Sequence, residues 1–267
     1  MQSSRSILTR FSLAATGPSL MNQTNFEWTP EFWEGWRESR NPYRRYKSDR
    51  DRRLVIESLD LRDGERVLEV GCGYGWISQA LWDAADIEWT GVDLSVEMVG
   101  RLRAAFPGRG ARTLLVDARE LPFRDGEFDK VLCTGVLMHI AENGLAVREL
   151  LRVLRPGGRL VCSINNALSP YSIPVRLWNW RKKGFVQKFQ LPRSFRQLLR
   201  KGGLQLDGMG GDGIIATVPL SIGRFHFPPV SICSLICRID EWLANRFAWL
   251  AYEVWFRGVK AIPPCAS

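Results

Sequence analysis

A glycine-rich turn limits the folds open to this chain more than any other feature. Before it, Arg66–Val70 has the composition of a short buried strand, and after it Trp76–Trp82 carries apolar residues at helical spacing. Glycines stand between them at positions 71, 73 and 75. A strand that enters a helix through glycines lets a ligand come close to backbone N–H groups at the helix N-terminus. The turn therefore predicts a binding site in an α/β fold.

The alternation of strand and helix patterns continues beyond this turn. The sequence predicts strands at Glu88–Val92, Thr113–Val116, Lys130–Thr134 and Arg159–Ser163, and helices at Ser95–Phe106 and Ala141–Leu154. Strands that alternate with helices pair in parallel and form a sheet with helices on both faces. The chain has 267 residues, of which 45% are hydrophobic, so it can bury a full core.

The spacing of the glycines distinguishes between the common ligands of such turns. The dinucleotide fingerprint is G-x-G-x-x-G, and Trp76 stands where its third glycine belongs, which disfavours an NAD-dependent oxidoreductase. No G-K-[ST] follows, which disfavours a phosphate-binding P-loop. The acid Glu69 precedes the glycines, and the run Glu69–Gly75 resembles the first motif of class I S-adenosylmethionine-dependent methyltransferases.

Later motifs continue this resemblance in order. Asp93 and Leu94 follow 22 and 23 residues after Gly71, where the family's acid binds the ribose hydroxyls. Asp117 and Ala118 resemble the adenine-side motif. The resemblance is closest to the type 11 group, which contains quinone, sterol and other small-molecule methyltransferases. It implies a Rossmann-like, seven-stranded, mostly parallel sheet with one antiparallel strand near its end, a helical cap and a C-terminal elaboration.

The fourth-strand motif Phe128–Ile140 and the helix-turn-strand Leu151–Leu160 complete the match. Together these motifs imply a site for S-adenosylmethionine made of Glu69, Gly71, Cys72, Gly73, Gly75, Asp93, Leu94, Asp117, Ala118 and Cys133. In-line methyl transfer to a small or lipid-like acceptor requires mainly orientation and exclusion of water. The chain reads Cys133–Val136 where nucleobase and glutamine methyltransferases have Asn-Pro-Pro-[Tyr/Phe], which disfavours those acceptors.

Two side chains near this site have alternative interpretations. His139, expected at the end of the fourth strand, is either a general base for an oxygen or carbon acceptor or a structural residue at the start of the next helix. Trp76 either flanks the cofactor or packs on the sheet. The sequence leaves both alternatives open.

A basic, aromatic segment follows the predicted core. Residues 165–206 contain no acid and nine basic residues: Arg176, Arg181, Lys182, Lys183, Lys188, Arg193, Arg196, Arg200 and Lys201. This number equals the net charge of +9 of the whole chain. The segment is a solvated surface, a lid with affinity for anionic lipid or a phosphorylated substrate, or a contact for RNA. An RNA methyltransferase and a non-catalytic partner protein therefore stay open as alternative functions.

The chain divides into four predicted parts. Residues 1–25 are a disordered tail or presequence, 26–60 a helical cap, 61–164 the cofactor-binding core, and 165–267 a lid that completes the fold. Near the end, Ile239–Phe256 predicts a helix with an apolar stripe, and Val254–Ile262 a closing strand. The predicted stripe consists of Trp242, Leu243, Phe247, Leu250 and Val254.

Cysteine and histidine usage indicates no metal site. The six cysteines form no CxxC pair, and there are two histidines. We expect reduced thiols in a cytoplasmic protein, with peripheral contact to an anionic membrane as an alternative, and Cys233 and Cys237 on one buried helical face. Charged residues and prolines interrupt the apolar stretch Ile214–Cys237, so it predicts no membrane span.

Overall fold

The computed structural model describes residues 42–181, 187–214, 220–222, 225–227 and 232–263. The predicted tail and the first part of the predicted cap lie outside these ranges. The division of the chain into four parts stays a prediction.

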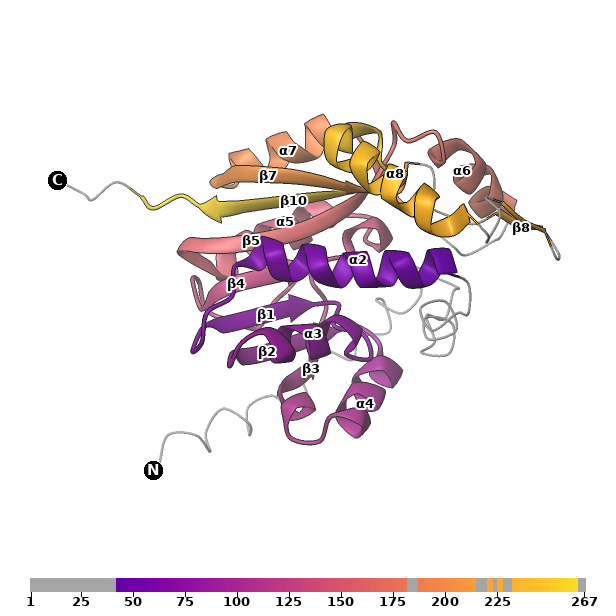
Figure 1. Cartoon of the computed structure of the whole chain (residues 1–267). Coiled ribbons are helices and arrows are strands. Elements are labelled where there is room, and N and C mark those ends of the chain that lie inside the picture. The colour runs from indigo at the N-terminus through magenta and orange to yellow at the C-terminus, as the bar shows by residue number, and fades with distance from the viewer. Residues whose placement is uncertain (1–41, 182–186, 215–219, 223–224, 228–231, 264–267) are drawn as a thin grey trace, which may run out of the picture.

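A single large sheet forms the centre of the molecule (Figure 1). Its strands are β1 (Arg66–Val70), β2 (Glu88–Asp93), β3 (Thr113–Leu115), β4 (Phe128–Cys133), β5 (Leu154–Asn166), β7 (Leu204–Asp212) and β10 (Glu253–Lys260), with the short β6 (Phe189–Gln190) paired to β5. The order is β3-β2-β1-β4-β5-β10-β7. Only β10 runs antiparallel to its neighbours among these strands. The predicted Rossmann-like, seven-stranded, mostly parallel sheet is confirmed, and β6 adds an eighth strand that the sequence did not predict.

Helices cover both faces of the sheet. They are α2 (Pro42–Leu59), α3 (Trp76–Ala84), α4 (Val96–Ala105), α5 (Asn143–Val153), α6 (Ser172–Arg181), α7 (Pro192–Lys201) and α8 (Cys233–Arg246). Short 3-10 turns occupy Arg109–Arg112, Leu137–His139 and Ala248–Leu250, and a separate hairpin pairs β8 (Leu220–Ile222) with β9 (Phe225–Phe227). None of the described helices is long and apolar enough to cross a membrane.

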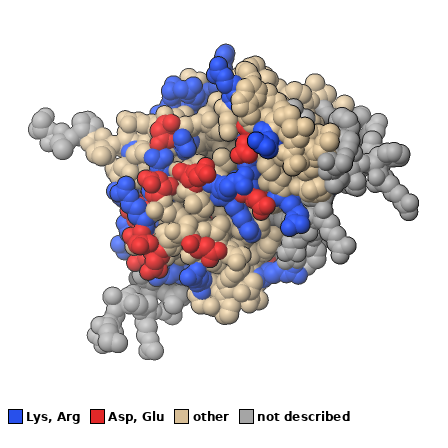
Figure 2. Space-filling view, in the orientation of Figure 1, with Lys and Arg blue, Asp and Glu red and all other residues tan. Residues whose placement is uncertain are grey.

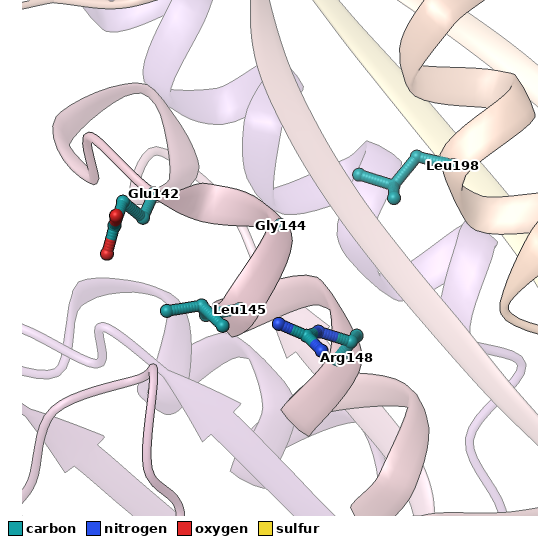
Figure 3. A pocket seen from close by; sticks show the side chains of 5 residues that line it. All are labelled: Glu142, Gly144, Leu145, Arg148 and Leu198. Atoms are coloured by element: carbon teal, nitrogen blue, oxygen red, sulfur yellow. The ribbon is translucent and has the colours of Figure 1, made fainter.

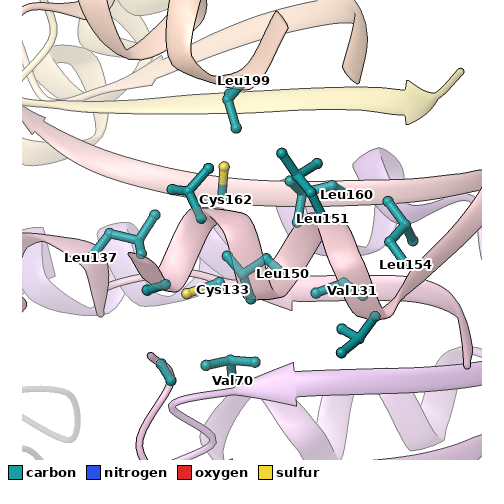
Figure 4. Packing of buried hydrophobic residues seen from close by; sticks show 14 of the residues in the cluster. Val70, Val131, Cys133, Leu137, Leu150, Leu151, Leu154, Leu160, Cys162 and Leu199 are labelled. Carbon is teal, nitrogen blue, oxygen red and sulfur yellow. The ribbon is translucent and has the colours of Figure 1, made fainter. Parts of the chain in front are cut away.

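The strands divide the apolar core into two clusters. Neighbouring residues on a strand point to opposite faces, so Leu68 and Val131 join the cluster under α5 and α7, whereas Val67 and Leu132 join the one under α2 and α3. Figure 4 shows the first cluster, in which side chains of α5 face those of β4 and β5. Burial on both faces explains why these strands read as continuous apolar runs.

The C-terminal helix differs from its prediction. α8 starts at Cys233 and ends at Arg246, and Val254 lies in β10. Cys233 and Cys237 lie on its buried face, as predicted, but Trp242 of the predicted apolar stripe is 64% exposed. The stripe is wrong because α8 buries another face, formed by Cys233, Cys237, Asp240 and Ala244, which packs on Tyr43 and on the ionised Arg50 of α2.

Those ionised residues form a cluster, here called the ionic cluster, between α2, β7, β10 and α8. The Nζ atom of Lys47 lies 3.1 Å from Asp51, 2.6 Å from Asp212 and 3.0 Å from Glu253. The geometry of these three carboxylates would suit a metal ion, but the Lys47 ammonium already lies among them. Burial by itself lowers the pKa of Lys47, yet the carboxylates, Asp212 foremost, raise it well above its usual range.

Arg50 extends the ionic cluster into the interior. Its side chain is 1% exposed, and its Nη2 donates to the carbonyl of Gly211 at 2.7 Å. Its Nη1 lies 3.5 Å from Asp212 and 3.7 Å from Asp240 of α8. The described part of the predicted cap is therefore one helix held to the sheet by apolar contacts at its C-terminal end and by buried charges nearer its start.

Candidate active site

The glycine turn lies at the edge where β1, β2, β4 and β5 all end. Gly71, Gly73 and Gly75 have φ values of +77°, +55° and +92°, which favour glycine. A Cβ added to Gly71 would lie 2.0 Å from Val136, so the segment after β4 closes tightly on the turn. A Cβ added to Gly73 would meet none of the described atoms within 4 Å. This open side of Gly73 gives a ligand room to reach the backbone.

The turn uses most of its own N–H groups internally. Gly71 and Cys72 donate to the carbonyl of Val92, and Gly75 donates to that of Cys72. Gly73 donates to Oδ2 of Asp93 at 2.8 Å. These four N–H groups, of three glycines and Cys72, are not available to a ligand, because the turn closes onto β2 and onto itself. What the glycines offer is close approach rather than free donors.

Asp93 connects this turn to the next loop. Its Oδ1 accepts from the N–H of Ser95 at 2.9 Å, and its Oδ2 accepts from Gly73. Burial raises the pKa of Asp93 against the opposing effect of these backbone donors. A carboxylate fixed beside the open side of Gly73 suits the two hydroxyls of a ribose.

Asp117 follows β3 and is held by Arg119. Both carboxylate oxygens accept from the guanidinium, with Nη2 to Oδ2 at 2.7 Å, and Oδ1 also accepts from the N–H of Arg119. Burial raises the pKa of Asp117, but these hydrogen bonds outweigh it and leave the pKa below its usual value. Sequence reasoning missed Arg119, although a basic residue two positions after an acid is a signal for such a turn.

Glu69 occupies a buried network rather than an open position. Glu69 is only 3% exposed, and its Oε2 accepts from the hydroxyl of Ser78 at 2.7 Å and from the indole N–H of Trp89 at 2.9 Å. These bonds connect β1 to α3 and β2. A role in positioning the glycine turn follows directly, whereas direct contact with a cofactor stays a prediction.

The remaining predicted cofactor residues divide by exposure. Leu94 is exposed at the end of β2, whereas Ala118, Cys72 and Cys133 are buried. Burial raises the pKa of Cys133 to about 12, and that of Cys72 well above its usual value. Both thiols are therefore inert at neutral pH, and Cys133 could reach the crevice only through its backbone.

His139 lies beyond β4, in the 3-10 turn that precedes α5. Its backbone N–H donates to the carbonyl of Val136. The carbonyl of the preceding residue, Met138, accepts from the backbone N–H of Lys188 at 2.7 Å. The strand ends at Cys133, so His139 follows the strand by six residues rather than ending it. Its catalytic role stays a prediction.

Residues 187–190 form a strap over this side of the site. Lys188 donates through Nζ to the carbonyl of Ala141 and to Asn143, and β6 pairs with the end of β5. Tyr252 donates to Gln187 at 2.9 Å. One of the nine basic residues of the segment is thus used to hold the strap in place.

Trp76 packs beneath α2, with the Arg52 guanidinium 4.7 Å from its ring centre.

A depression of about 370 Å³ lies on the outer surface between α5 and α7 (Figure 3). It is lined by Glu142, Gly144, Leu145, Arg148 and Leu198. None of these belongs to the glycine turn or to the loops that carry Asp93 and Asp117. The depression therefore lies beside the loop that holds Lys188 rather than at the glycine turn.

The chain matches a family model described as a methyltransferase domain over residues 68–162. Residues 68–162 are therefore similar to a methyltransferase domain. The matched stretch contains every residue predicted to line the cofactor site and is the part that the sequence motifs covered. S-adenosylmethionine is the methyl donor of the class I fold to which the domain belongs, and the open side of Gly73 beside Asp93 fits that donor.

The names of several similar proteins specify the methylation of small molecules. The 27-O-demethylrifamycin SV methyltransferase of Amycolatopsis mediterranei is 39% identical over 106 residues, covering 38% of this chain and 39% of that protein. The demethylmenaquinone methyltransferase of Symbiobacterium thermophilum is 37% identical over 132 residues, covering 46% and 51%. The 2-methyl-6-phytyl-1,4-hydroquinone methyltransferase of Synechocystis is 34% identical over 119 residues, covering 44% and 37%. The chain thus matches about half or less of the length of these relatives.

Solved structures resemble the whole described fold. A methyltransferase from Archaeoglobus fulgidus has a TM-score of 0.58 at 18% identity, covering 86% of this chain and 98% of that one. A chain of the Haloferax volcanii complex between the Trm112 activator and a methyltransferase has a TM-score of 0.59 at 21% identity. The match covers 82% of this chain and 94% of that one. Identities this low establish the fold alone.

Proposed function

We propose that this protein transfers a methyl group from S-adenosylmethionine to a small, apolar acceptor. One observation supports this most strongly: Gly73, whose Cβ side is open, donates its N–H to the half-buried carboxylate of Asp93 within the stretch that matches a methyltransferase domain. The names of two relatives specify a hydroquinone and a menaquinone precursor, which favours an acceptor of that class. A lipid-like acceptor and peripheral membrane contact by the basic segment belong to the same proposal.

In this proposal each residue has a separate task. The donor supplies an electrophilic methyl carbon on a sulfonium, so the chain needs no nucleophile of its own. Asp93 accepts from the ribose hydroxyls, and Asp117, held by Arg119, accepts from the adenine amine. Glu69 positions the turn through Ser78 and Trp89.

The acceptor side requires alignment and removal of a proton. The strap of residues 187–190 is fixed to the loop of His139 and limits access of water there. His139 takes the proton from an acceptor hydroxyl as its oxygen attacks the methyl carbon in line. Reduced turnover of His139→Ala with near-normal cofactor affinity supports this role, and unchanged turnover contradicts it.

Titration calorimetry with S-adenosylhomocysteine, the product of the donor, tests the site without knowledge of the acceptor. We expect micromolar binding by the full chain and loss of more than about tenfold in Gly73→Asn, because a side chain there fills the open side and Asn tolerates positive φ. Gly64→Asn is the matched control, since Gly64 has a φ of +78° and equal space but precedes β1. Equal affinities of the two variants, or no binding by a folded wild-type sample, would overturn the proposal.

The two alternatives from the sequence predict different results. An RNA methyltransferase binds RNA with strong salt dependence, because phosphate contacts release counterions. A non-catalytic partner protein gives no turnover with any acceptor. Binding of the product followed by methylation of a quinol, with no RNA binding at moderate salt, excludes both.

A further inference from the structure

The outward face of α8 has the composition of a buried surface. Ile232, Leu235, Ile239 and Trp242 follow one another at spacings of three, four and three residues and lie on one side of the helix. All four are exposed, Leu235 by 57% and Trp242 by 64%. We call these four residues the α8 stripe. An exposed apolar stripe of this kind marks a contact surface.

The opposite face of α8 is fixed to the protein. Asp240 accepts from the N–H of Ile214 at 2.8 Å and lies 3.7 Å from Arg50. The carbonyl of Cys237 accepts from Tyr46 at 2.9 Å. The helix cannot rotate to bury its stripe without breaking these buried contacts, so the stripe is available to a partner.

The charges beside the stripe are positive. Arg238 and Arg246 are exposed on α8 and flank the stripe at helical spacing. The one partly exposed acid of the helix, Glu241, is directed to α2, where it contacts Tyr46 and Arg53. Figure 2 shows charges of both signs over much of the visible face and a mainly uncharged area at its upper right.

A second apolar helix lies at the same end of the sheet. α6 exposes Ile173 and Leu177 together with Arg176. The loop before it is joined to the turn after α8, because Asn166 donates to the carbonyls of Trp249 and Ala251. Figure 1 places both helices at the end where the parallel strands terminate, which is the end of the candidate active site.

We propose that the α8 stripe docks on an anionic lipid surface, with Arg238 and Arg246 in contact with the headgroups. Apolar side chains including Trp, flanked by Arg, are the composition of helices that lie in a membrane interface. A second copy of the chain fits less well, because the outward face of α8 carries Arg238 and Arg246, whereas its acid Glu241 is directed to α2 and does not pair with them across a twofold contact. The inference rests on the proposed function only for its consequence, namely that an apolar acceptor reaches the active site from the membrane.

Sedimentation of the full chain with vesicles tests this proposal. We expect binding to phosphatidylcholine vesicles with roughly 30% phosphatidylglycerol, and weaker binding to phosphatidylcholine alone. Leu235→Ser and Trp242→Ser each lower the partition coefficient about tenfold, because each removes an apolar side chain from the interface. Arg238→Gln lowers it about fivefold on anionic vesicles.

Matched controls separate docking from unfolding. Ile262→Ser changes a side chain that is 74% exposed outside the stripe and leaves vesicle binding unchanged. All variants keep the wild-type circular dichroism. The proposal is overturned if wild type binds neither vesicle, if the stripe variants bind as wild type does, or if Trp242→Ser instead abolishes a dimer seen by light scattering.

Product binding by the same samples distinguishes the two proposals. Vesicle binding without affinity for S-adenosylhomocysteine contradicts the proposed function and leaves the docking surface intact. Product binding without vesicle binding contradicts the docking surface and the membrane contact of the basic segment, but not binding of the methyl donor.

Discussion

Helices α3 and α8 both pack beside the sheet, but α3 buries large apolar side chains, whereas α8 buries an acid among small apolar side chains. α3 buries Leu81 and Trp82, as the apolar spacing of its sequence predicts. α8 buries Asp240 and exposes Leu235 and Trp242. Apolar spacing therefore identifies a helical face in both cases but gives the direction of that face only where the neighbouring layer is apolar.

The neighbours explain the difference. α3 lies over apolar residues of β1 and β2, so its own apolar face is removed from water there. α8 lies over Arg50, whose buried guanidinium needs acceptors such as Asp240. Variants of these helices and of the residues beneath them can break or sharpen this comparison, and the predictions follow from the largest expected effect to the smallest.

Arg50→Met is expected to destabilise the fold by about 3–5 kcal/mol, because it leaves the buried carboxylate of Asp240 without its cation and Asp212 with Lys47 alone. Urea denaturation measures the loss. Arg53→Ala is the control, since Arg53 is 56% exposed and lies 3.9 Å from Glu241, and it costs about 0.5 kcal/mol or less. Similar costs for the two variants would show that the ionic cluster does not hold α2 and α8 to the sheet.

Leu81→Ala is expected to cost about 3 kcal/mol, whereas Leu235→Ala, the same change on α8, costs less than about 0.5 kcal/mol. Leu81 is fully buried and leaves a cavity, but Leu235 leaves none. The same denaturation assay compares them directly. A large cost at Leu235 would mean that the α8 stripe is covered within the protein, and would contradict its role in docking.

Asp93 gives the cofactor side a pH dependence. Burial raises its pKa, so the carboxyl group becomes protonated as the pH falls, at a higher pH than an ordinary aspartate. We expect affinity for S-adenosylhomocysteine to fall about tenfold as the pH decreases through that pKa, because a neutral carboxyl accepts more weakly. Asp117 titrates lower, since hydrogen bonds from Arg119 lower its pKa despite burial.

Asp93→Asn is the control for this titration. It binds more weakly at neutral pH and loses the acid-dependent fall. Titration calorimetry at several pH values measures both. A parallel fall in wild type and Asp93→Asn would assign the pH dependence to another group.

The sequence was sufficient for the region from β1 to β5. Each strand and helix there has its own apolar pattern, and the glycines at 71, 73 and 75 stand where the chain must adopt positive φ. The sequence could not predict the hydrogen-bond partners of Glu69, because Ser78 and Trp89 come near it only when α3 and β2 lie beside β1. The strap of residues 187–190 was missed for the same reason.

The C-terminal region shows what patterns cannot supply. Its predicted strand is confirmed by β10, but the helix before it was extended into that strand. Of the ionic cluster, only the Lys47 and Asp51 pair, four residues apart, has a sequence signal. Arg50 and Asp240 are separated by 190 positions, and no local pattern brings them together.

By itself the sequence determined the strand and helix order, the glycine turn and the acids at or near the ends of β1, β2 and β3, because these depend on local conformation and on spacing along the chain. The tertiary structure alone decided which face of α8 is buried, which groups neutralise Arg50, and which apolar side chains stay exposed. These depend on which side chains of neighbouring helices and strands face each other in the folded protein. A buried charge is stable only beside a partner of opposite charge, and the fold decides where that partner lies.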